Sequence, residues 1–145
     1  MILGQVKGII SKKRQIAFPK AFRKEMGDEV IVTKGINNYL QIVGKQNWEI
    51  LLEGTKGQPF TDKATRDLQR YLFGNAKEVR FDQQGRMLLP QYLIEYAELK
   101  SEVIFVGVER YVELWDKDVF FAYDQTVSRS AELLTIDLSK SHGHE

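Results

Sequence analysis

Two short turns carry the residue types best suited to binding a polyanion. In the second turn, within FDQQGRMLLP at residues 81–90, Asp82 and Arg86 stand at a spacing that allows an ion pair. Asp82 can accept hydrogen bonds from backbone N–H groups of the turn, and Gly85 can take the positive φ of a tight hairpin. Arg86 would then either brace the hairpin or point its planar guanidinium at a phosphate or a base edge. The residues alone leave both roles open.

The first turn, within ISKKRQIAFP at residues 10–19, is a basic variant of the second. Counted back from the proline that follows each turn, the equivalent positions are Ser11 and Asp82, Arg14 and Gly85, and Gln15 and Arg86. Arginine tolerates positive φ poorly, so this turn is expected to be strained or of a different type. Ser11 can form a weaker local turn bond but offers no charge to hold an arginine. Three consecutive cations, Lys12, Lys13 and Arg14, are unfavourable there unless an anion such as phosphate neutralises them.

Charge is distributed unevenly along the chain, although the formal net charge is only +1. Residues 1–24 contain seven Lys or Arg and no Asp or Glu, whereas residues 102–145 contain nine acids and four bases. This separation suggests that the N-terminal end meets a polyanion and that the acidic end supplies solubility or partner contacts. A lysine-rich solvated edge is the alternative. The candidate DNA-binding residues are Lys12, Lys13, Arg14, Gln15, Lys20, Arg23 and Arg86, with Ser11, Asp82 and Gly85 as structural turn residues.

Few residues could carry catalysis. The chain has no cysteine, and its two histidines, His142 and His144, stand in the last four residues, where two ligands make a poor metal site. No glycine-rich phosphate loop is present. The carboxylates of Glu113, Asp116 and Asp118 are better explained by the start of a helix than by a catalytic pair. The sequence therefore predicts no enzyme, no cofactor, no metal and no small-molecule substrate.

The expected location is the cytoplasm. The start, MILGQVKGII, lacks the charged and apolar regions of a signal peptide, and no run approaches the roughly 18 apolar residues of a membrane span. The absence of cysteine fits a reducing compartment. We expect no contact with a membrane.

The chain contains an internal repeat, in which Pro19 and Pro90 lie 71 positions apart. Each proline follows a short run of strand formers, QIAF or RMLL, and opens a helical segment in which Phe22 corresponds to Leu93. Further on, VIVTKGINNYLQIV resembles VIFVGVERYVELW, and both are typical of hairpins. Each half is thus predicted to form a hairpin, a short helix, a second hairpin and a helix. Because about 70 residues bury little core, the halves are expected to share one.

The predicted boundaries follow from this repeat. Between the halves, TDKATRDLQRYLFGNA predicts a helix that Thr61 or Asp62 caps and that stops at Gly74, with Leu68, Tyr71 and Leu72 on its core face. A last helix is expected from after Asp116 to about Leu134. The predicted units are a first half at 1–54, a linker region at 55–76, a second half at 77–134 and a disordered tail at 135–145.

The two turns with their proline-led helices, together with RDLQRYLFGNA and VGVERYVELWD, resemble the MraZ family of bacterial transcription regulators over roughly residues 1–125. Asp82 and Arg86 match the D-x-x-x-R motif of that family, from which Ser11 and Gln15 depart. The resemblance implies an α+β, mainly β fold of two tandem AbrB/SpoVT-like swapped-hairpin halves, with a pseudo-two-fold β-barrel core and flanking helices. It also implies a ring-shaped homo-oligomer, associated with the nucleoid, that binds direct repeats in double-stranded DNA. These repeats lie upstream of the division and cell-wall gene cluster, which includes the regulator's own gene.

Two other functions are weighed against this interpretation. One is a protein-interaction module of the division machinery that uses its acidic C-terminal half as a working surface. The other is an RNA-binding protein, which the absence of an aromatic-rich RNP pattern disfavours. Within the DNA-binding interpretation, Arg14 could replace the missing motif arginine only if the first turn shifts its register by one residue. Otherwise we expect the first turn to read hardly any sequence.

Overall fold

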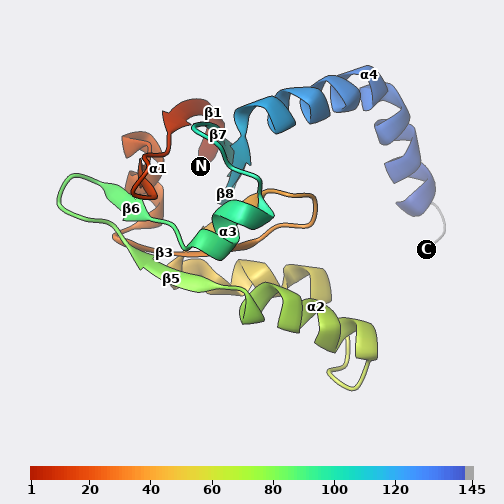
Figure 1. Cartoon of the computed structure of the whole chain (residues 1–145). Coiled ribbons are helices and arrows are strands. Elements are labelled where there is room, and N and C mark those ends of the chain that lie inside the picture. The colour runs from red at the N-terminus through yellow and green to blue at the C-terminus, as the bar shows by residue number, and fades with distance from the viewer. Residues whose placement is uncertain (143–145) are drawn as a thin grey trace.

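The chain follows one order of strands and helices twice. The structure, a computed structural model, describes residues 1–142 (Figure 1). The first half contains β1 (Ile2–Ile9), β2 (Gln15–Ala17), α1 (Lys20–Met26), β3 (Glu29–Lys34), β4 (Leu40–Gly44) and the 3₁₀ segment η1 (Lys45–Thr55). Helix α2 (Lys63–Gly74) follows. The second half contains β5 (Lys77–Arg80), β6 (Arg86–Leu88), α3 (Gln91–Tyr96), β7 (Glu102–Glu109), β8 (Tyr111–Asp116) and α4 (Lys117–His142).

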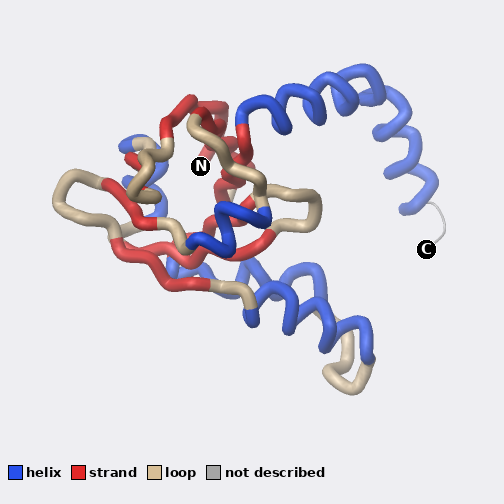
Figure 2. The backbone as a smooth tube through the Cα atoms, in the orientation of Figure 1, coloured by secondary structure: helices blue, strands red, loops and turns tan. Residues whose placement is uncertain are grey.

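The two halves exchange strands. The main sheet is antiparallel with the order β1-β7-β8-β4-β3-β5, and β2 pairs with β6 in a separate two-stranded ribbon. The opening hairpin that was predicted for each half is therefore replaced by pairing with the other half. In the first half, the end of β1 and the strand β2 are joined only by an isolated bridge between Ile10 and Ile16. Figure 2 shows the strands gathered in one part of the molecule, with α2 and α4 extending away from them.

The exchange is symmetric between the halves. In the ribbon, Ile16 pairs with Met87, its equivalent in the repeat, and in the sheet Gln41 pairs with Glu113, its equivalent there. The pairings leave β1 and β5 as free edges, so the sheet is not closed into the barrel that was predicted. The reason is that the chain turns sharply after each edge strand and enters the β2–β6 ribbon, whose strands pair with each other rather than with the sheet.

Both halves contribute to one hydrophobic core, as expected for halves of this size. The repeat-equivalent side chains Phe22 and Leu93 are both buried, on α1 and α3. Phe18 packs against Phe81 and Phe105 of the second half, with ring centroids 5.1 and 5.2 Å apart. Burial of these aromatic side chains across the repeat ties the halves together.

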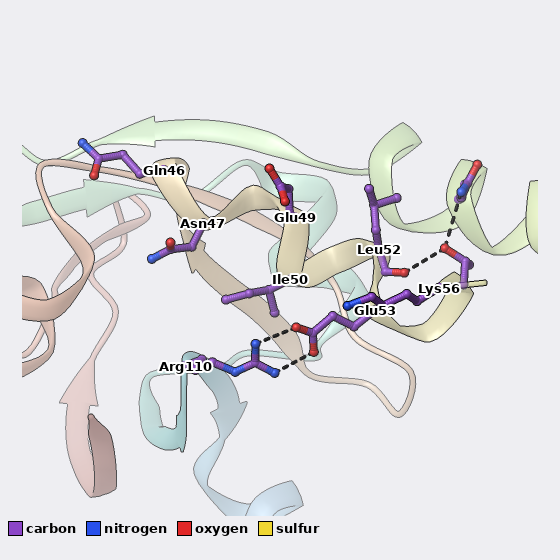
Figure 3. A pocket seen from close by; sticks show the side chains of 10 residues that line it. Gln46, Asn47, Glu49, Ile50, Leu52, Glu53, Lys56 and Arg110 are labelled. Atoms are coloured by element: carbon purple, nitrogen blue, oxygen red, sulfur yellow. Dashed lines mark hydrogen bonds and ion pairs between the residues drawn. The ribbon is translucent and has the colours of Figure 1, made fainter. Parts of the chain in front are cut away.

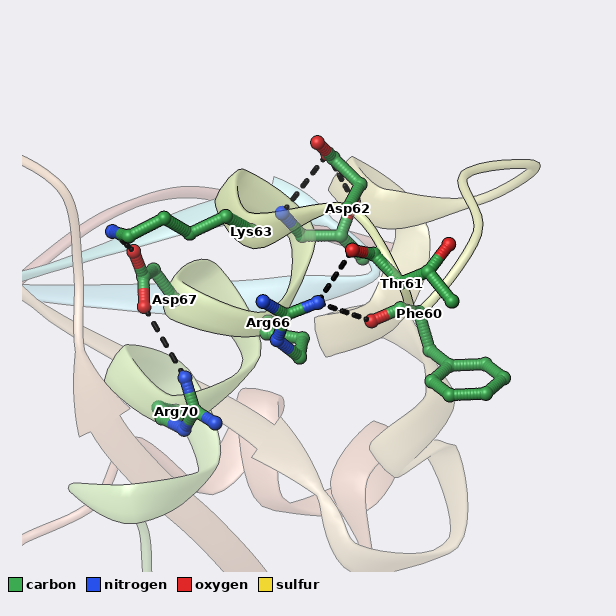
Figure 4. A network of polar contacts seen from close by, with 8 residues as sticks. Phe60, Thr61, Asp62, Lys63, Arg66, Asp67 and Arg70 are labelled. Atoms are coloured by element: carbon green, nitrogen blue, oxygen red, sulfur yellow. Dashed lines mark hydrogen bonds and ion pairs between the residues drawn. The ribbon is translucent and has the colours of Figure 1, made fainter.

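Helix α2 begins at the predicted cap. The carboxylate of Asp62 accepts hydrogen bonds from the backbone N–H of Thr65 at 3.2 Å and from its hydroxyl at 2.8 Å (Figure 4). Arg66 donates to the backbone carbonyls of Phe60 and Thr61, which fastens the preceding loop to the helix. On the predicted core face, Leu72 is buried, whereas Leu68 and Tyr71 are half-buried.

Helix α4 is longer than predicted. It continues past Leu134 to His142, so the expected tail from residue 135 is helical as far as the described residues reach, and His144 lies outside them. The sequence explains the extension, because no glycine or proline interrupts residues 117–142 and Ala131 to Leu134 are good helix formers. Among residues 1–142, no helix is both long and apolar enough to cross a bilayer.

The start of α4 is anchored to the sheet by aromatic contacts. The ring of Trp115 stacks between those of Tyr39 and Tyr123, at centroid distances of 4.9 and 5.1 Å. The Asp116 carboxylate accepts hydrogen bonds from the backbone N–H groups of Asp118 and Val119, as a helix cap does. Asp116 and Asp118 are thus explained by the helix start, whereas Glu113 lies on β8 and accepts a hydrogen bond from Trp115 Nε1 at 3.0 Å.

Candidate nucleic-acid interface

The two turns have the same backbone geometry. In both 11–15 and 82–86, the amide of the first residue donates to the carbonyl of the fifth at 2.9 Å. The amide of the fourth residue donates to the carbonyl of the first at 2.9 Å in one turn and 3.0 Å in the other. Arg14 accordingly adopts a φ of 65°, close to the 76° of Gly85. The first turn is therefore not of a different type, and the one-residue register shift considered for Arg14 is wrong.

Asp82 organises the second turn. Its Oδ1 accepts from the backbone N–H groups of Gln84 and Arg86, both at 2.9 Å, and its Oδ2 accepts from Arg86 Nε at 3.0 Å. These contacts lower the pKa of Asp82, the backbone N–H of Arg86 contributing most. Arg86 thus braces the hairpin, while its side chain stays 42% exposed.

Ser11 reproduces only part of this arrangement. Its hydroxyl oxygen accepts from the backbone N–H groups of Lys13 at 3.2 Å and Gln15 at 3.1 Å, which are the equivalents of the two backbone bonds to Asp82. No carboxylate is present to hold a cation. The first turn keeps the backbone of the second and replaces its ion pair with free positive charge.

Arg23 lies against the second turn rather than the first. Its Nε donates to the carbonyl of Phe18 at 3.3 Å, and a Cβ on Gly85 would collide with its guanidinium. Gly85 is therefore required both for its positive φ and for the space that Arg23 fills. Arg23 is half-buried, so packing is one of its roles.

The strand exchange brings α1 next to the second turn. A hollow of about 410 Å³ lies between α1 and the second turn. Basic residues from both halves line it, together with the acidic residues Asp28 and Asp82. These bases are Lys20, Arg23, Lys24 and Arg80. Lys20 and Arg23 were predicted to lie on the helix that follows the first turn, and neither Lys24 nor Arg80 was among the candidate DNA-binding residues. The chain shows no local signal for this grouping, because it arises from pairing between distant strands.

The N-terminal cations lack counter-charges. Within residues 1–142, no ion pair involves any of the seven basic residues of the first 24 positions. Elsewhere in the described chain most bases are paired, namely Lys45, Lys63, Arg70, Arg80, Arg86, Lys100, Arg110 and Lys117. Lys12, Lys13 and Lys20 are also exposed. This surface is free to neutralise phosphates.

Another hollow, of about 650 Å³, lies on η1 and involves neither turn (Figure 3). Among the residues that line it, Arg110 donates two hydrogen bonds of 2.6 Å to the carboxylate of Glu53. This pairing lowers the pKa of Glu53 and raises that of Arg110. Because the two charges satisfy each other, the contact fastens η1 to the turn between β7 and β8.

Comparison with known proteins covers both halves. A family model described as "MraZ protein, putative antitoxin-like" matches residues 1–71 and 72–136, one match for each repeat. The transcriptional regulator MraZ of Clostridium acetobutylicum is 37% identical over 126 residues, which cover 87% of this chain and 89% of the relative. That of Acetivibrio thermocellus is 38% identical over 132 residues, covering 91% and 92%. That of Clostridium tetani is 34% identical over 140 residues, covering 92% and 99%. Since both repeats and nearly the full length of these relatives are matched, the resemblance predicted from the sequence is confirmed, and the chain belongs to the MraZ family.

Proposed function

We propose that the chain is a transcriptional regulator that binds double-stranded DNA, and not an enzyme. The single observation that carries this proposal is the set of unpaired cations in residues 1–24. A cluster of like charges without ion-pair partners is stabilised by a polyanion, and duplex DNA presents one charge per about 1.7 Å of its axis. The names of the relatives, all transcriptional regulators, support the same function.

The finer proposal is a ring-shaped homo-oligomer in the cytoplasm, associated with the nucleoid, that binds direct repeats upstream of the division and cell-wall genes, including its own. The family resemblance supports it, as does the opposite charge of the two ends, which suits head-to-tail packing of subunits. Repeated subunits on repeated sites would also multiply modest affinities. In this proposal Lys12, Lys13, Arg14 and Lys20 contact phosphates.

A salt titration tests the proposal. Replacing Lys12, Lys13 and Arg14 by alanine should weaken binding to all DNA sequences and flatten the plot of log affinity against log salt. Each lost phosphate contact removes about 0.9 from the slope, so the expected change is on the order of 2 to 3. The matched control replaces Lys56, which follows η1, and Arg129 and Lys140 of α4; all three are exposed, and the slope should be unchanged. If both triple variants behave alike, the basic turn is a solvated edge.

A second candidate function, a protein-interaction module, is favoured by one feature of α4. Four apolar side chains near its end are exposed, namely Leu133, Leu134, Ile136 and Leu138. Single exposed apolar residues are normal on a surface, but a group on one projecting helix suits contact with protein. If this helix binds protein, replacing the four residues by serine should abolish contacts with a partner or with other subunits. If the chain also binds DNA, as proposed above, the same variant should keep the salt-dependent binding of DNA by a single subunit.

A further inference from the structure

The β2–β6 ribbon has one buried and one exposed face. Ile16 and Met87, which pair with each other, are both only 1% exposed. Because successive side chains of a strand alternate between faces, the neighbours of these two residues point outward. Those neighbours are Gln15, Ala17, Arg86 and Leu88. Leu88 is 51% exposed on this face.

The ladder places Gln15 and Leu88 directly opposite each other. The amide of Leu89 donates to the carbonyl of Arg14 at 2.9 Å, and that of Phe18 to the carbonyl of Gly85 at 3.0 Å. Hydrogen-bonded and non-hydrogen-bonded pairs alternate in an antiparallel ladder, so Gln15 and Leu88 form a non-hydrogen-bonded pair. In such pairs the Cα atoms are about 4.5 Å apart and the side chains are close. The side-chain amide of Gln15 and the isobutyl group of Leu88 therefore lie next to each other on the outward face of the ribbon.

The charge around this face decides what covers it. The first turn, with Lys12, Lys13 and Arg14, leads directly into β2, and Arg86 belongs to β6 itself. Arg86 is already paired with Asp82, but a second protein surface that covered Leu88 would have to bury or pair the cations of the first turn, and an unpaired buried charge is strongly unfavourable. DNA pairs them with phosphates while it offers apolar methyl groups and base edges in the groove between.

We propose that the Gln15–Leu88 pair reads A·T base pairs in the major groove, Leu88 by contact with a thymine methyl group and Gln15 by two hydrogen bonds to an adenine. The inference rests on the proposed function and adds to it the bases that are recognised. The major groove admits a two-stranded β-ribbon, glutamine matches the N6 and N7 positions of adenine, and apolar side chains match the thymine methyl. No pattern in the sequence points to this role for Leu88, because RMLL predicts only a short strand.

Removing single methyl groups from DNA tests the inference. Wild-type protein selects its preferred fragment from random-sequence DNA, and each thymine of that fragment is then replaced by deoxyuridine, which lacks only the methyl group. We expect one or a few positions at which wild-type affinity falls about fourfold, the effect of exposing one buried methyl. Leu88→Ala should bind the thymine fragment about fourfold or more weakly and should be insensitive to deoxyuridine at those positions. Gln15→Ala should lose on the order of tenfold preference for adenine at a neighbouring position.

Controls separate this inference from the proposed function. Leu3→Ala removes a leucine of similar exposure, 63%, from β1 and should keep the sensitivity to deoxyuridine. All variants should keep the salt-dependent binding of random DNA, because no cation is removed. If wild-type protein shows that binding but no sensitivity to any deoxyuridine, or if Leu88→Ala weakens thymine and deoxyuridine fragments equally, the inference is overturned and the proposed function stands. If wild-type protein binds no DNA, both fail.

Discussion

Replacing Arg14 by glycine should separate the fold of the first turn from its charge. Arg14 holds a left-handed backbone conformation that its counterpart Gly85 adopts freely. That conformation costs a side-chain-bearing residue about 1 to 2 kcal/mol, and glycine gives back about 0.4 to 1 kcal/mol through the greater entropy of the unfolded chain. Arg14→Gly should therefore raise the free energy of unfolding by about 0.5 to 1 kcal/mol relative to Arg14→Ala, which removes the same side-chain packing but keeps the strained backbone.

Urea unfolding at one fixed protein concentration measures this difference, since assembly would otherwise shift the midpoint. In DNA-binding assays the two variants should be alike, each with a salt slope smaller by about 0.9, because both lose one cation. Gly85→Ala is the converse control and should be destabilising, because it adds backbone strain and a collision with Arg23. If Arg14→Gly is no more stable than Arg14→Ala, the turn does not store strain and the reasoning fails.

Four further outcomes are expected. Asp82→Ala should lower the urea midpoint more than Ser11→Ala, and the deficit should vanish as the pH falls through the lowered pKa of Asp82, where the wild-type carboxylate also loses its charge. Burial raises the pKa of Glu113, so the stability of the wild-type protein should fall as the pH rises from about 4.5 through that pKa. Glu113→Gln should be more stable than the wild type at pH 7. Urea unfolding from pH 4 to 8 should show that this variant has lost the pH dependence. Light scattering of the full chain should give several times 16.8 kDa. Deleting residues 133–145 should change the free energy of unfolding by less than about 0.5 kcal/mol, because the described side chains of this segment are exposed.

Local signals in the sequence predicted the local features well. The proline-led helices, the cap at Asp62 and the ion pair between Asp82 and Arg86 all depend on residues close together in the chain, and the structure has each of them. The repeat was also visible in the sequence, because equivalent positions such as Phe22 and Leu93 are apolar in both halves. The sequence thus contained enough to place both turns.

Features that depend on distant strands could not be predicted in this way. An alternating pattern shows that a strand has an inner and an outer face, but it does not say which strand lies at its edge. The exchange of β1 and β5 was therefore expected only from the family resemblance, and the meeting of Lys20 and Arg23 with the second turn was missed. The geometry of the first turn could not be predicted for another reason. Ser11 and Arg14 stand where the second turn has aspartate and glycine, and an arginine keeps a positive φ only where the surrounding strands hold the turn in place.

The exchange of strands has a consequence for synthesis of the chain. Strand β1 is synthesised long before its partner β7, and Ile2 pairs with Glu109. Until most of the chain has been made, β1 is an unpaired strand with apolar side chains at Leu3, Val6 and Ile9, the kind of segment that pairs with other nascent chains. Gly4 and Gly8 weaken its tendency to form a strand, and the cations from Lys7 onward repel copies of itself. The basic N-terminus would then act twice, first as a gatekeeper against aggregation during translation and later as the surface that meets DNA.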